Sequence, residues 1–576
     1  MVNFRVFPFV PALIALAIPL MIPTPARACG GTFCDAGPAV PMPVDQTGEN
    51  ILFHIGDNSV EAHIQIQIDP ETPAEQFAWV IPVTALPTFS VGSQPLFAAM
   101  MAGTAPRYFQ SFTADVCGPV DGFDFGDEGG DDGGSGLTGG EGGDDGGTDV
   151  PEVVFQDTVG AFEIAVLDGG TVEGVMTWLG DNGYQQDPNA EPILAHYLDN
   201  EFLFVALKLA VEAGVDEVHP IVIRYEGVEP CVPIRLTQIA AVEDMDIGVF
   251  FLGDARVVPT NYRHVLVNPL KIDWFSNAAN YKEVVTLAVD SPEADGNAFV
   301  TEYAGTSDVI DLSQVYDPSW SSAFYAGLVD SPVGAIERLQ ADGLFFCDLD
   351  FNFVCLSLHP LLGPLLAEYI PVPAGVSFNE FYDCLSCYAE DIDLVAWDAA
   401  AFAAKLEQRI FAPGLNASLL VAANPYLTRM YTTISPSEMN TDPMFRSNST
   451  LPEVPAVHIA NQRILCDGSR LVTLPDGREV FFPAGDPLVW PDFQDEMPFA
   501  EEVDQETAAQ DAPLVNLVNN TEEINRLLDE HNKVRGYDKH SVPGCGACST
   551  TDTPLGGVGF GLASLALFGF VRRRRS

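Results

Sequence analysis

The stretch ENILFHIGDNSVEAHIQIQID, residues 49–69, contains the pattern that predicts the first strands of this chain. Apolar side chains at positions 60, 62, 64, 66 and 68 alternate with polar side chains at 61, 63, 65, 67 and 69. This two-residue period is typical of a β-strand, and Gly56-Asp57-Asn58 supplies turn residues before it. The stretch therefore predicts a β-hairpin.

Strand and helix patterns are mixed along the rest of the chain. Short helices are expected at 95–101, 171–179 and 193–198. Strands are expected at 77–83, 107–116, twice within 153–170, and at 202–210, 220–225, 232–240, 246–251, 426–434 and 471–482. Because no regular strand–helix–strand rhythm links them, the sequence predicts an α+β, mainly antiparallel, β-rich body.

Changes in composition divide the chain into segments. We expect a β-rich first part of the body at 29–120, an α+β second part at 150–315 and a β-rich return at 426–485. The Ala- and Leu-rich residues 316–425 predict a helical, cysteine-containing insertion with a helix over 399–411. Residues 486–554 are expected to form an acidic, stalk-like linker that ends in a cysteine pair. Within it, Asn520 and Glu523 are spaced as a capping box for a helix over 520–534.

Residues 121–149 stand apart, with 13 glycines and 10 acidic residues and no lysine or arginine. Such a segment has too little apolar surface to offset the entropy cost of ordering, which predicts a disordered acidic loop. Calcium binding is the alternative. The acids lack the fixed spacing of a calcium loop, so the solvated tether is preferred over Ca²⁺ binding.

Both ends of the chain predict export and anchoring. Residues 1–28 contain an apolar run followed by Ala26-Arg27-Ala28, the pattern of a secretory signal peptide. Residues 555–571 carry no charge and are long enough for one transmembrane helix, and residues 572–575 are four arginines that would stay in the cytoplasm. We therefore expect a membrane-anchored or cell-surface protein whose bulk lies outside the cytoplasm. Acylation at Cys29 is the alternative anchor.

Charge and composition exclude some classes of function. The formal net charge is −55, from 81 acidic against 26 basic residues. Because so few cations cannot form a basic stripe, nucleic acid is not an expected partner. A hydrophobic content of 47% is that of a globular chain.

The eleven cysteines of an exported chain predict disulfides. Cys29 and Cys34 are close in sequence, and we pair them. Cys117 and Cys231 are also paired, which leaves Cys466 as a free thiol. Two further bridges are expected, with local or crossed pairing left open, among Cys347, Cys355, Cys384 and Cys387.

No catalytic or metal motif stands out. HExxH, P-loop and G-x-S-x-G patterns are absent from the sequence. His54 and His63 lie on neighbouring predicted strands and could share a metal, but strand histidines are usually structural. Residues 348–352 resemble the start of an EF-hand, and Phe353 then stands where glycine is required. The spacing of residues 347, 355, 384 and 387 does not fit a zinc site, so no catalytic residue and no cofactor is assigned.

Several motifs resemble a known family. They are ACGGTFCD at 28–35, PVDQTGENILF at 43–53, FAWVIPV at 77–83, WLGDNGY at 178–184, FVALKL at 204–209, PCVPIRLTQIAA at 230–241 and LTRMYTTISPSEMNTDPMF at 427–445. Together they resemble the exported bacterial family called domain of unknown function 2330. The resemblance implies an exported protein of unknown activity and supplies no catalytic residues.

The tail resembles a second pattern. Cys545 and Cys548, a polar spacer, an apolar span and an arginine cluster are similar to the MYXO-CTERM type of sorting tail. This resemblance implies cleavage by a sorting or processing protease near one of these cysteines, with transfer to the cell surface and lipid on a cysteine.

These observations leave two hypotheses for function. The first is a non-enzymatic binding or envelope-structural protein at the cell surface. The alternative is a surface hydrolase or protease whose site is assembled from distant residues. A cavity with clustered His, Asp and Ser would favour the hydrolase, and an apolar or aromatic surface would favour the binding protein.

Overall fold

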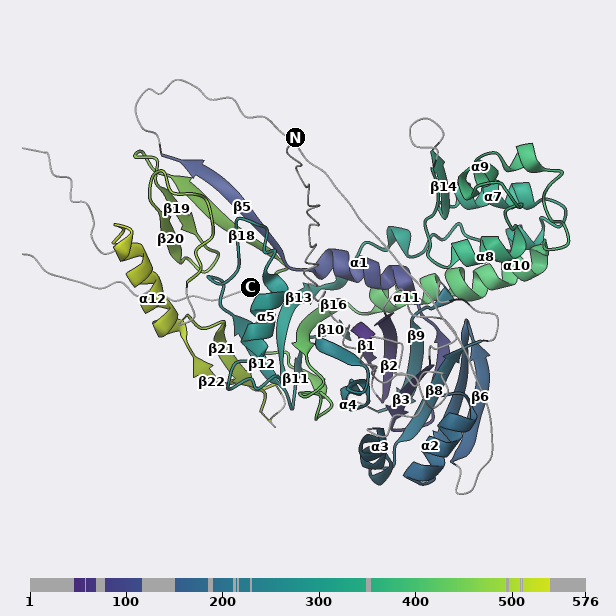
Figure 1. Ribbon diagram of the computed structural model, residues 1–576, viewed down its shortest axis with the longest axis horizontal. Helices are drawn as coiled ribbons and strands as arrows, with labels where there is room; N and C mark the ends of the chain where they lie inside the picture. Colours follow the sequence, from purple (N-terminus) through teal and green to yellow (C-terminus); the bar gives the residue numbers. More distant parts are fainter. Residues whose placement is uncertain are drawn as a thin grey trace, which may run out of the picture.

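The computed structural model describes residues 46–56, 58–68, 78–115, 151–184, 190–210, 214, 217–227, 230–348, 354–493, 497–507, 509 and 511–538. The predicted signal peptide, acidic loop, transmembrane span and arginine cluster lie outside these residues. Figure 1 shows a strand-rich body with a group of helices at one end. The α+β class is confirmed. None of the helices in the described part of the chain is long and apolar enough to cross a membrane.

A ten-stranded sheet organises the body. Its strand order is β22-β21-β12-β13-β16-β10-β1-β2-β9-β4, and its pairs are antiparallel except β1 with β10 and β12 with β13. In the same order, the strands are Val515–Asn519, Ala500–Gln505, Arg263–Val267, Ala298–Thr306, Tyr426–Ile434, Ala241–Gly253, Gln46–Ile55, Ser59–Ile68, Ile221–Glu226 and Thr88–Val91.

The predicted hairpin lies inside this sheet, between β10 on one side and β9 on the other. β1 and β2 pair antiparallel from Ile55 with Val60 onward, and the amide of Gly56 donates to the carbonyl of Ser59 at 2.8 Å. Ile51, Val60 and Ile64 belong to the main core on one face of the sheet. Both faces of the hairpin are covered, since Leu52 packs in a second core on the other face.

Two four-stranded sheets and several helices cover the central sheet. The sheet β3-β8-β7-β6 shares the main core and carries α2 and α3 on its outer side, and the sheet β20-β19-β18-β5 packs with α12. These elements are β3 Ala78–Val83, β8 Leu203–Leu209, β7 Phe162–Asp168, β6 Glu152–Val159, α2 Val172–Asp181, α3 Ala190–Asp199, β20 Glu479–Phe482, β19 Arg470–Thr473, β18 Val457–Ile464, β5 Arg107–Ala114 and α12 Thr521–Val534.

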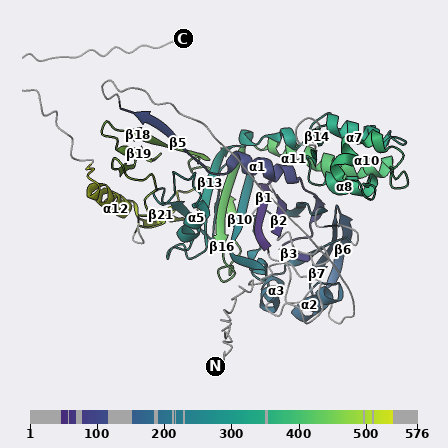
Figure 2. The same cartoon turned by 45° about the horizontal axis from the view of Figure 1, so that its top comes forward.

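On the other face of the central sheet, α1 and α11 share a core with Leu52 and Phe250, and α5 packs beside β12 and β16. Figures 1 and 2 both place α1 and α11 between the central sheet and the helical end of the molecule. These helices are α1 Gln94–Thr104, α11 Ala412–Ala423 and α5 Tyr281–Val289. A short pair, β11 Val257–Pro259 with β17 Phe445–Ser447, completes this part.

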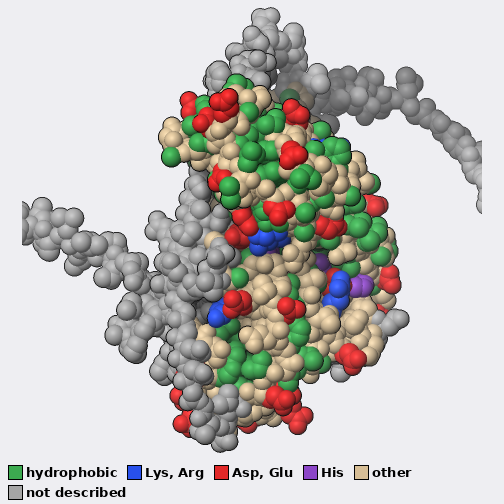
Figure 3. Space-filling model, turned by 90° about the vertical axis from the view of Figure 1, so that its right-hand side faces the viewer, with side chains coloured by type: hydrophobic (Ala, Val, Ile, Leu, Met, Phe, Trp, Pro, Cys, Tyr) green, Lys and Arg blue, Asp and Glu red, His purple; other side chains and the backbone are tan. Residues whose placement is uncertain are grey.

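The region expected to be a helical insertion has a core of its own. It contains α6 Ser322–Ala326, α7 Pro332–Ala341, α8 Leu362–Tyr369, α9 Phe378–Asp383, α10 Ala399–Leu406 and the hairpin of β14 Phe345–Asp348 with β15 Val354–Ser357. The predicted helix over 399–411 is confirmed, because α10 continues through a π-helical turn, Glu407–Phe411, into α11. Figure 3 shows acidic side chains spread over this side of the molecule, with few basic ones among them.

Two local predictions are wrong. The strand expected at 232–240 is instead the short helix α4, Ile234–Thr237, because Pro233 in front of it fixes the backbone for a helix start. The capping box of α12 does not form, since Asn520 makes no side-chain cap and Glu523 pairs with Arg526 at 2.6 Å.

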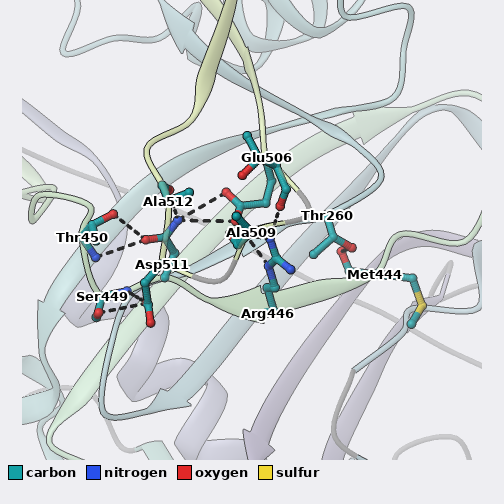
Figure 4. A network of polar contacts seen from close by, with 11 residues as sticks. Thr260, Met444, Arg446, Ser449, Thr450, Glu506, Ala509, Asp511 and Ala512 are labelled. Carbon is teal, nitrogen blue, oxygen red and sulfur yellow. Dashed lines mark hydrogen bonds and ion pairs between the residues drawn. The ribbon is translucent and has the colours of Figure 1, made fainter.

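The stalk predicted for residues 486–554 is also wrong within the described residues. β21 and β22 pair with the central sheet, and Trp490 and Met497 are buried in the core beneath α12. Figure 4 shows how the segment after β21 is attached to the body: Arg446 contacts Glu506, and Ser449 contacts Asp511. The side-chain amide of Asn448 also donates to the carbonyl of Ala512 at 2.7 Å. Aromatic and apolar residues in this acidic segment therefore make it part of the body.

Candidate ligand-binding site

A cavity of about 240 Å³ lies where two neighbouring strands of the central sheet separate. β12 and β13 run parallel but pair only briefly, and the last pair is His264 with Phe299. The residues that follow, 266–267 on β12 and 300–302 on β13, line the cavity. Side chains from other elements surround the gap between the strands. We call this space the β12–β13 cavity.

Aromatic rings from separate segments form one wall of the β12–β13 cavity. The ring of Tyr108 on β5 lies 5.0 Å from that of Trp274, 5.9 Å from that of Tyr281 and 4.8 Å from the stacked ring of His458. The indole nitrogen of Trp274 donates to the carbonyl of Pro269 at 2.9 Å. Because its one donor is used, Trp274 offers the cavity an apolar surface.

A buried carboxylate lies beside this wall. The register between β13 and β16 shifts between Thr301 and Tyr303, so Glu302 is the extra residue of a β-bulge. Bulges redirect a side chain that would otherwise follow the alternation of the strand. Glu302 lines the cavity although the residue is only 3% exposed.

Glu302 has one cationic partner. Its Oε2 lies 2.7 Å from Nε of Arg429, which is also buried, and the hydroxyl of Tyr281 hydrogen-bonds to the carboxylate. Burial raises the pKa of Glu302 above its ordinary value, and Arg429 and Tyr281 offset only part of that effect. The carboxylate is therefore incompletely compensated by the groups around it.

A neutral histidine lies next to the cavity. Nε2 of His264 is 3.1 Å from Nη2 of Arg256 and 2.8 Å from Oγ1 of Thr301, which lines the cavity. Because an arginine can only donate, Nε2 accepts and the ring proton is on Nδ1. Burial, together with the charge of Arg256, lowers the pKa of His264 to about 3. This histidine is consequently a structural acceptor at neutral pH.

The rim of the β12–β13 cavity is acidic. Asp476 and Glu501 line it, and one guanidinium nitrogen of Arg478 lies 2.8 Å from a carboxylate oxygen of each. Leu266, which is 49% exposed, stands at the cavity edge. The cavity thus combines an aromatic wall, a buried carboxylate and an acidic rim, and no lysine or arginine lines it.

A second, smaller cavity of about 100 Å³ lies inside the main core. Cys231 and Asp442 line it, and the carboxylate of Asp442 accepts from the hydroxyl of Tyr197 at 2.7 Å and the amide of Arg235 at 2.9 Å. Burial and the nearby Asp442 raise the pKa of the Cys231 thiol well above its ordinary value. A protonated thiol is a poor nucleophile, so this arrangement is structural.

Two of the sequence motifs meet beside the smaller cavity. Residues 230–241 and 427–445 meet there, because Cys231 bridges antiparallel to Met444 and the amide of Phe445 donates to the carbonyl of Pro230 at 3.2 Å. These motifs fasten the chain before β10 to the chain after β16. Their role in the structure is therefore to fix the central sheet.

The cysteines of the helical insertion pair locally. Cys347 is bonded to Cys355 across the β14–β15 hairpin, and Cys384 is bonded to Cys387. The expectation of two bridges among these four residues is confirmed, and the crossed alternative is wrong. Each bond closes a short loop within one part of the insertion.

The expected pairing of Cys117 with Cys231 is wrong, because Cys231 is free. The expectation of a free Cys466 is also wrong, since Cys466 is disulfide-bonded. Its partner lies outside the described residues, as do Cys29, Cys34, Cys117, Cys545 and Cys548. The acidic loop considered for Ca²⁺ lies outside them as well.

Within the described residues, the metal sites considered from the sequence gain no support. His54 and His63 are on neighbouring strands, but His63 lies 2.8 Å from Glu61 and no third ligand completes a cluster with the two histidines. The one group with suitable spacing is Cys347, Cys355 and Asp383, and its two sulfurs are bonded to each other. That group therefore lacks free thiolates.

The sequence interpretation missed the residues of the β12–β13 cavity. They come from five stretches, 106–108, 266–281, 300–302, 454–476 and 501, which no local pattern connects. One signal was present: Glu302 and Arg429 each stand alone within an apolar strand pattern, in AFVTEYA at 298–304 and YLTRMYT at 426–432. Opposite charges in two buried strands indicate that the strands are neighbours.

Comparisons with known proteins give one match. No curated protein and no solved structure matches the chain. A family model described as an uncharacterized protein conserved in bacteria, DUF2330, matches residues 23–446, which is more than half of the 576 residues. The match ends before the tail, so the sorting signal stays a prediction. The family resemblance seen in the motifs is thereby confirmed, and the chain belongs to the DUF2330 family of uncharacterized bacterial proteins.

Proposed function

We propose that this chain is a non-enzymatic binding protein whose ligand, a small molecule with an apolar part, occupies the β12–β13 cavity. The observation that carries the proposal is the cavity itself, about 240 Å³ between separated strands and walled by aromatic rings. Ligand sites are typically apolar hollows with a few placed polar groups. Here Glu302 and Thr301 supply those groups.

The same proposal includes export and anchoring. Support comes from the signal-like residues 1–28, the apolar residues 555–571 and the two disulfides of the helical insertion, since disulfides persist in oxidising compartments. Deleting residues 554–576 should release the protein from the membrane fraction. If the truncated protein remains membrane-bound, acylation at Cys29 replaces the C-terminal anchor.

A surface hydrolase has less support. The buried carboxylate of Glu302 in the β12–β13 cavity is paired with Arg429, and neither serine nor cysteine lines that cavity. Cys231 lines the other cavity, where its thiol pKa is raised by burial.

Binding can be tested with 2-phenylethanol, a small probe with an aromatic ring and a neutral hydroxyl, by ligand-observed NMR on the folded chain. Leu266→Trp should abolish binding, because the larger side chain at the cavity edge closes access. Leu287→Trp is the matched control: Leu287 is 40% exposed on α5 and does not line the cavity. Absence of binding by the wild-type protein, or equal binding by both variants, would contradict the proposal.

A further inference from the structure

We propose that the ligand of the β12–β13 cavity is a small organic cation, an amine or quaternary ammonium group attached to an apolar body. This inference rests on the proposed binding function and specifies its ligand class. Three carboxylates line the cavity, those of Glu302, Asp476 and Glu501, and no lysine or arginine does. The arginines that pair with these acids approach them from outside the lining.

The aromatic wall suits a cation. Tyr108, Trp274 and Tyr281 line the cavity, and their rings lie within 6 Å of one another through Tyr108. Trp274 donates to a backbone carbonyl and Tyr281 hydrogen-bonds to Glu302. With these donors used, the rings offer a ligand chiefly their π-systems, whose negative faces attract ammonium groups. An anion would meet the same faces unfavourably.

The buried carboxylate gives the cation a specific partner. Nε of Arg429 is 2.7 Å from Oε2 of Glu302, but the two groups are not aligned for a hydrogen bond, and Nη1 of Arg429 has no partner among the described groups. The guanidinium carbon lies 5.6 Å from the ring of Phe250, on the core side of the sheet. Glu302 therefore remains able to attract a second cation from the cavity, where low polarity strengthens the interaction.

The rim favours the same sign of charge. Arg478 is shared between Asp476 and Glu501, which leaves two carboxylates against one guanidinium. The whole chain carries a formal charge of −55, which raises the local concentration of cations and repels anions. The aromatic rings, the buried Glu302 and the two carboxylates at the rim thus all favour a positively charged ligand.

Three probes of nearly equal size test the inference: phenethylamine, 2-phenylethanol and phenylacetate, which are cationic, neutral and anionic at pH 7. Their binding to the folded wild-type chain is measured by calorimetry or ligand-observed NMR. We expect phenethylamine to bind at least about tenfold more tightly than 2-phenylethanol, as a desolvated cation–π contact allows. Phenylacetate should bind least.

A double variant, Glu302→Gln with Arg429→Met, removes the buried pair as a unit and leaves no unpaired charge. It should lose most of the preference for phenethylamine over 2-phenylethanol, measured as the ratio of the two dissociation constants. Glu368→Gln, which removes an exposed carboxylate in the helical insertion, should keep the preference.

The outcomes separate the two proposals. Binding of 2-phenylethanol as tight as that of phenethylamine overturns the cation inference and leaves the binding function standing. Absence of binding by all three probes overturns both. If the double variant does not fold, the comparison of probes on the wild-type protein still decides the question.

Discussion

Two buried arginines affect their ionisable neighbours in opposite ways. Arg429 lies beside Glu302 and favours its charged form, although burial still raises the pKa of that carboxyl. Arg256 lies beside His264 and disfavours a charged imidazole, so its effect adds to that of burial. Glu302 therefore keeps a cationic partner that favours its carboxylate, whereas His264 is held as a neutral imidazole. Both residues are buried and both lie beside an arginine. The difference arises because a positive charge stabilises a carboxylate and destabilises an imidazolium.

A pH dependence follows for His264. Its pKa is about 3 in the folded chain and ordinarily 6.5. The unfolded chain therefore takes up a proton more readily between these values, and stability falls as the pH drops below about 6.5. Between pH 7 and pH 5 the loss from this residue should be about 1–2 kcal/mol. Urea unfolding at both pH values should show a smaller difference for His264→Gln than for the wild type.

Thr301→Val is the control for that measurement. It removes the hydroxyl that contacts the His264 ring at 2.8 Å but leaves the titrating group in place. This variant should lose stability at both pH values and keep the wild-type pH difference. A His264→Gln variant with an unchanged pH difference would show that another group carries the effect.

At the scale of elements, β5 and β18 join two parts of the chain that are far apart in sequence. They pair in parallel register to Ala114 with Ile464, and the amide of Asp115 donates to the carbonyl of Ile464 at 2.9 Å. Cys466 follows Ile464 by two residues, and Cys117 follows Asp115 by two. We therefore predict that Cys466 is bonded to Cys117. Non-reducing peptide mapping should recover this bridge, whereas a bridge from Cys466 to another cysteine would contradict the register argument.

Asn448 joins the chain after β17 to the segment between β21 and β22. It is fully buried, its amide donates to the carbonyl of Ala512 at 2.7 Å, and its oxygen accepts from the hydroxyl of Thr450 at 2.7 Å. Asn448→Ala should destabilise the protein by about 2–4 kcal/mol, because it leaves buried polar groups unpaired. Thermal unfolding measures the loss. Asn516→Ala, at an exposed asparagine on β22, should change stability by less than about 0.5 kcal/mol.

Elements with a local signal could be predicted from the sequence, and those set by distant contacts could not. The alternation in β2 and the helical spacing in α2 are properties of short stretches. Residues 232–240 carry buried apolar side chains at 232, 234, 236 and 240, a two-residue spacing that is typical of a strand although a helix forms there. The β12–β13 cavity depends on where two strands part, and strand register over long distances is invisible in one sequence.

At the scale of the whole molecule, the central sheet is assembled from both ends of the described chain. Two of its inner strands, β1 and β2, come from the first described residues, and the strands at one end of the sheet, β21 and the edge strand β22, come from near the last. The family model ends at residue 446, before β18 to β22 and α12. The family-matched residues therefore lack one partner strand for β5 and one for β12.

This architecture predicts that residues 29–446 alone do not form a stable domain. Truncation after 446 removes Trp490, Phe493 and Met497 from the core that covers Trp274 and Ile272. A large buried apolar side chain contributes about 1.5–3 kcal/mol, and a typical domain is stable by only about 5–15 kcal/mol. The loss of three such residues, together with two strand partners, should therefore abolish cooperative thermal unfolding and make the fragment sensitive to proteolysis.

Residues 29–538 are the matched comparison, since this variant keeps every described element and lacks only the tail. It should unfold cooperatively at the temperature of the longer chain. A stalk would behave differently, because its removal leaves the melting temperature of the body unchanged. Cooperative unfolding of residues 29–446 at the same temperature would therefore restore the stalk interpretation. It would also move the β12–β13 cavity outside the stable body, because His458, Asp476 and Glu501 belong to the removed part.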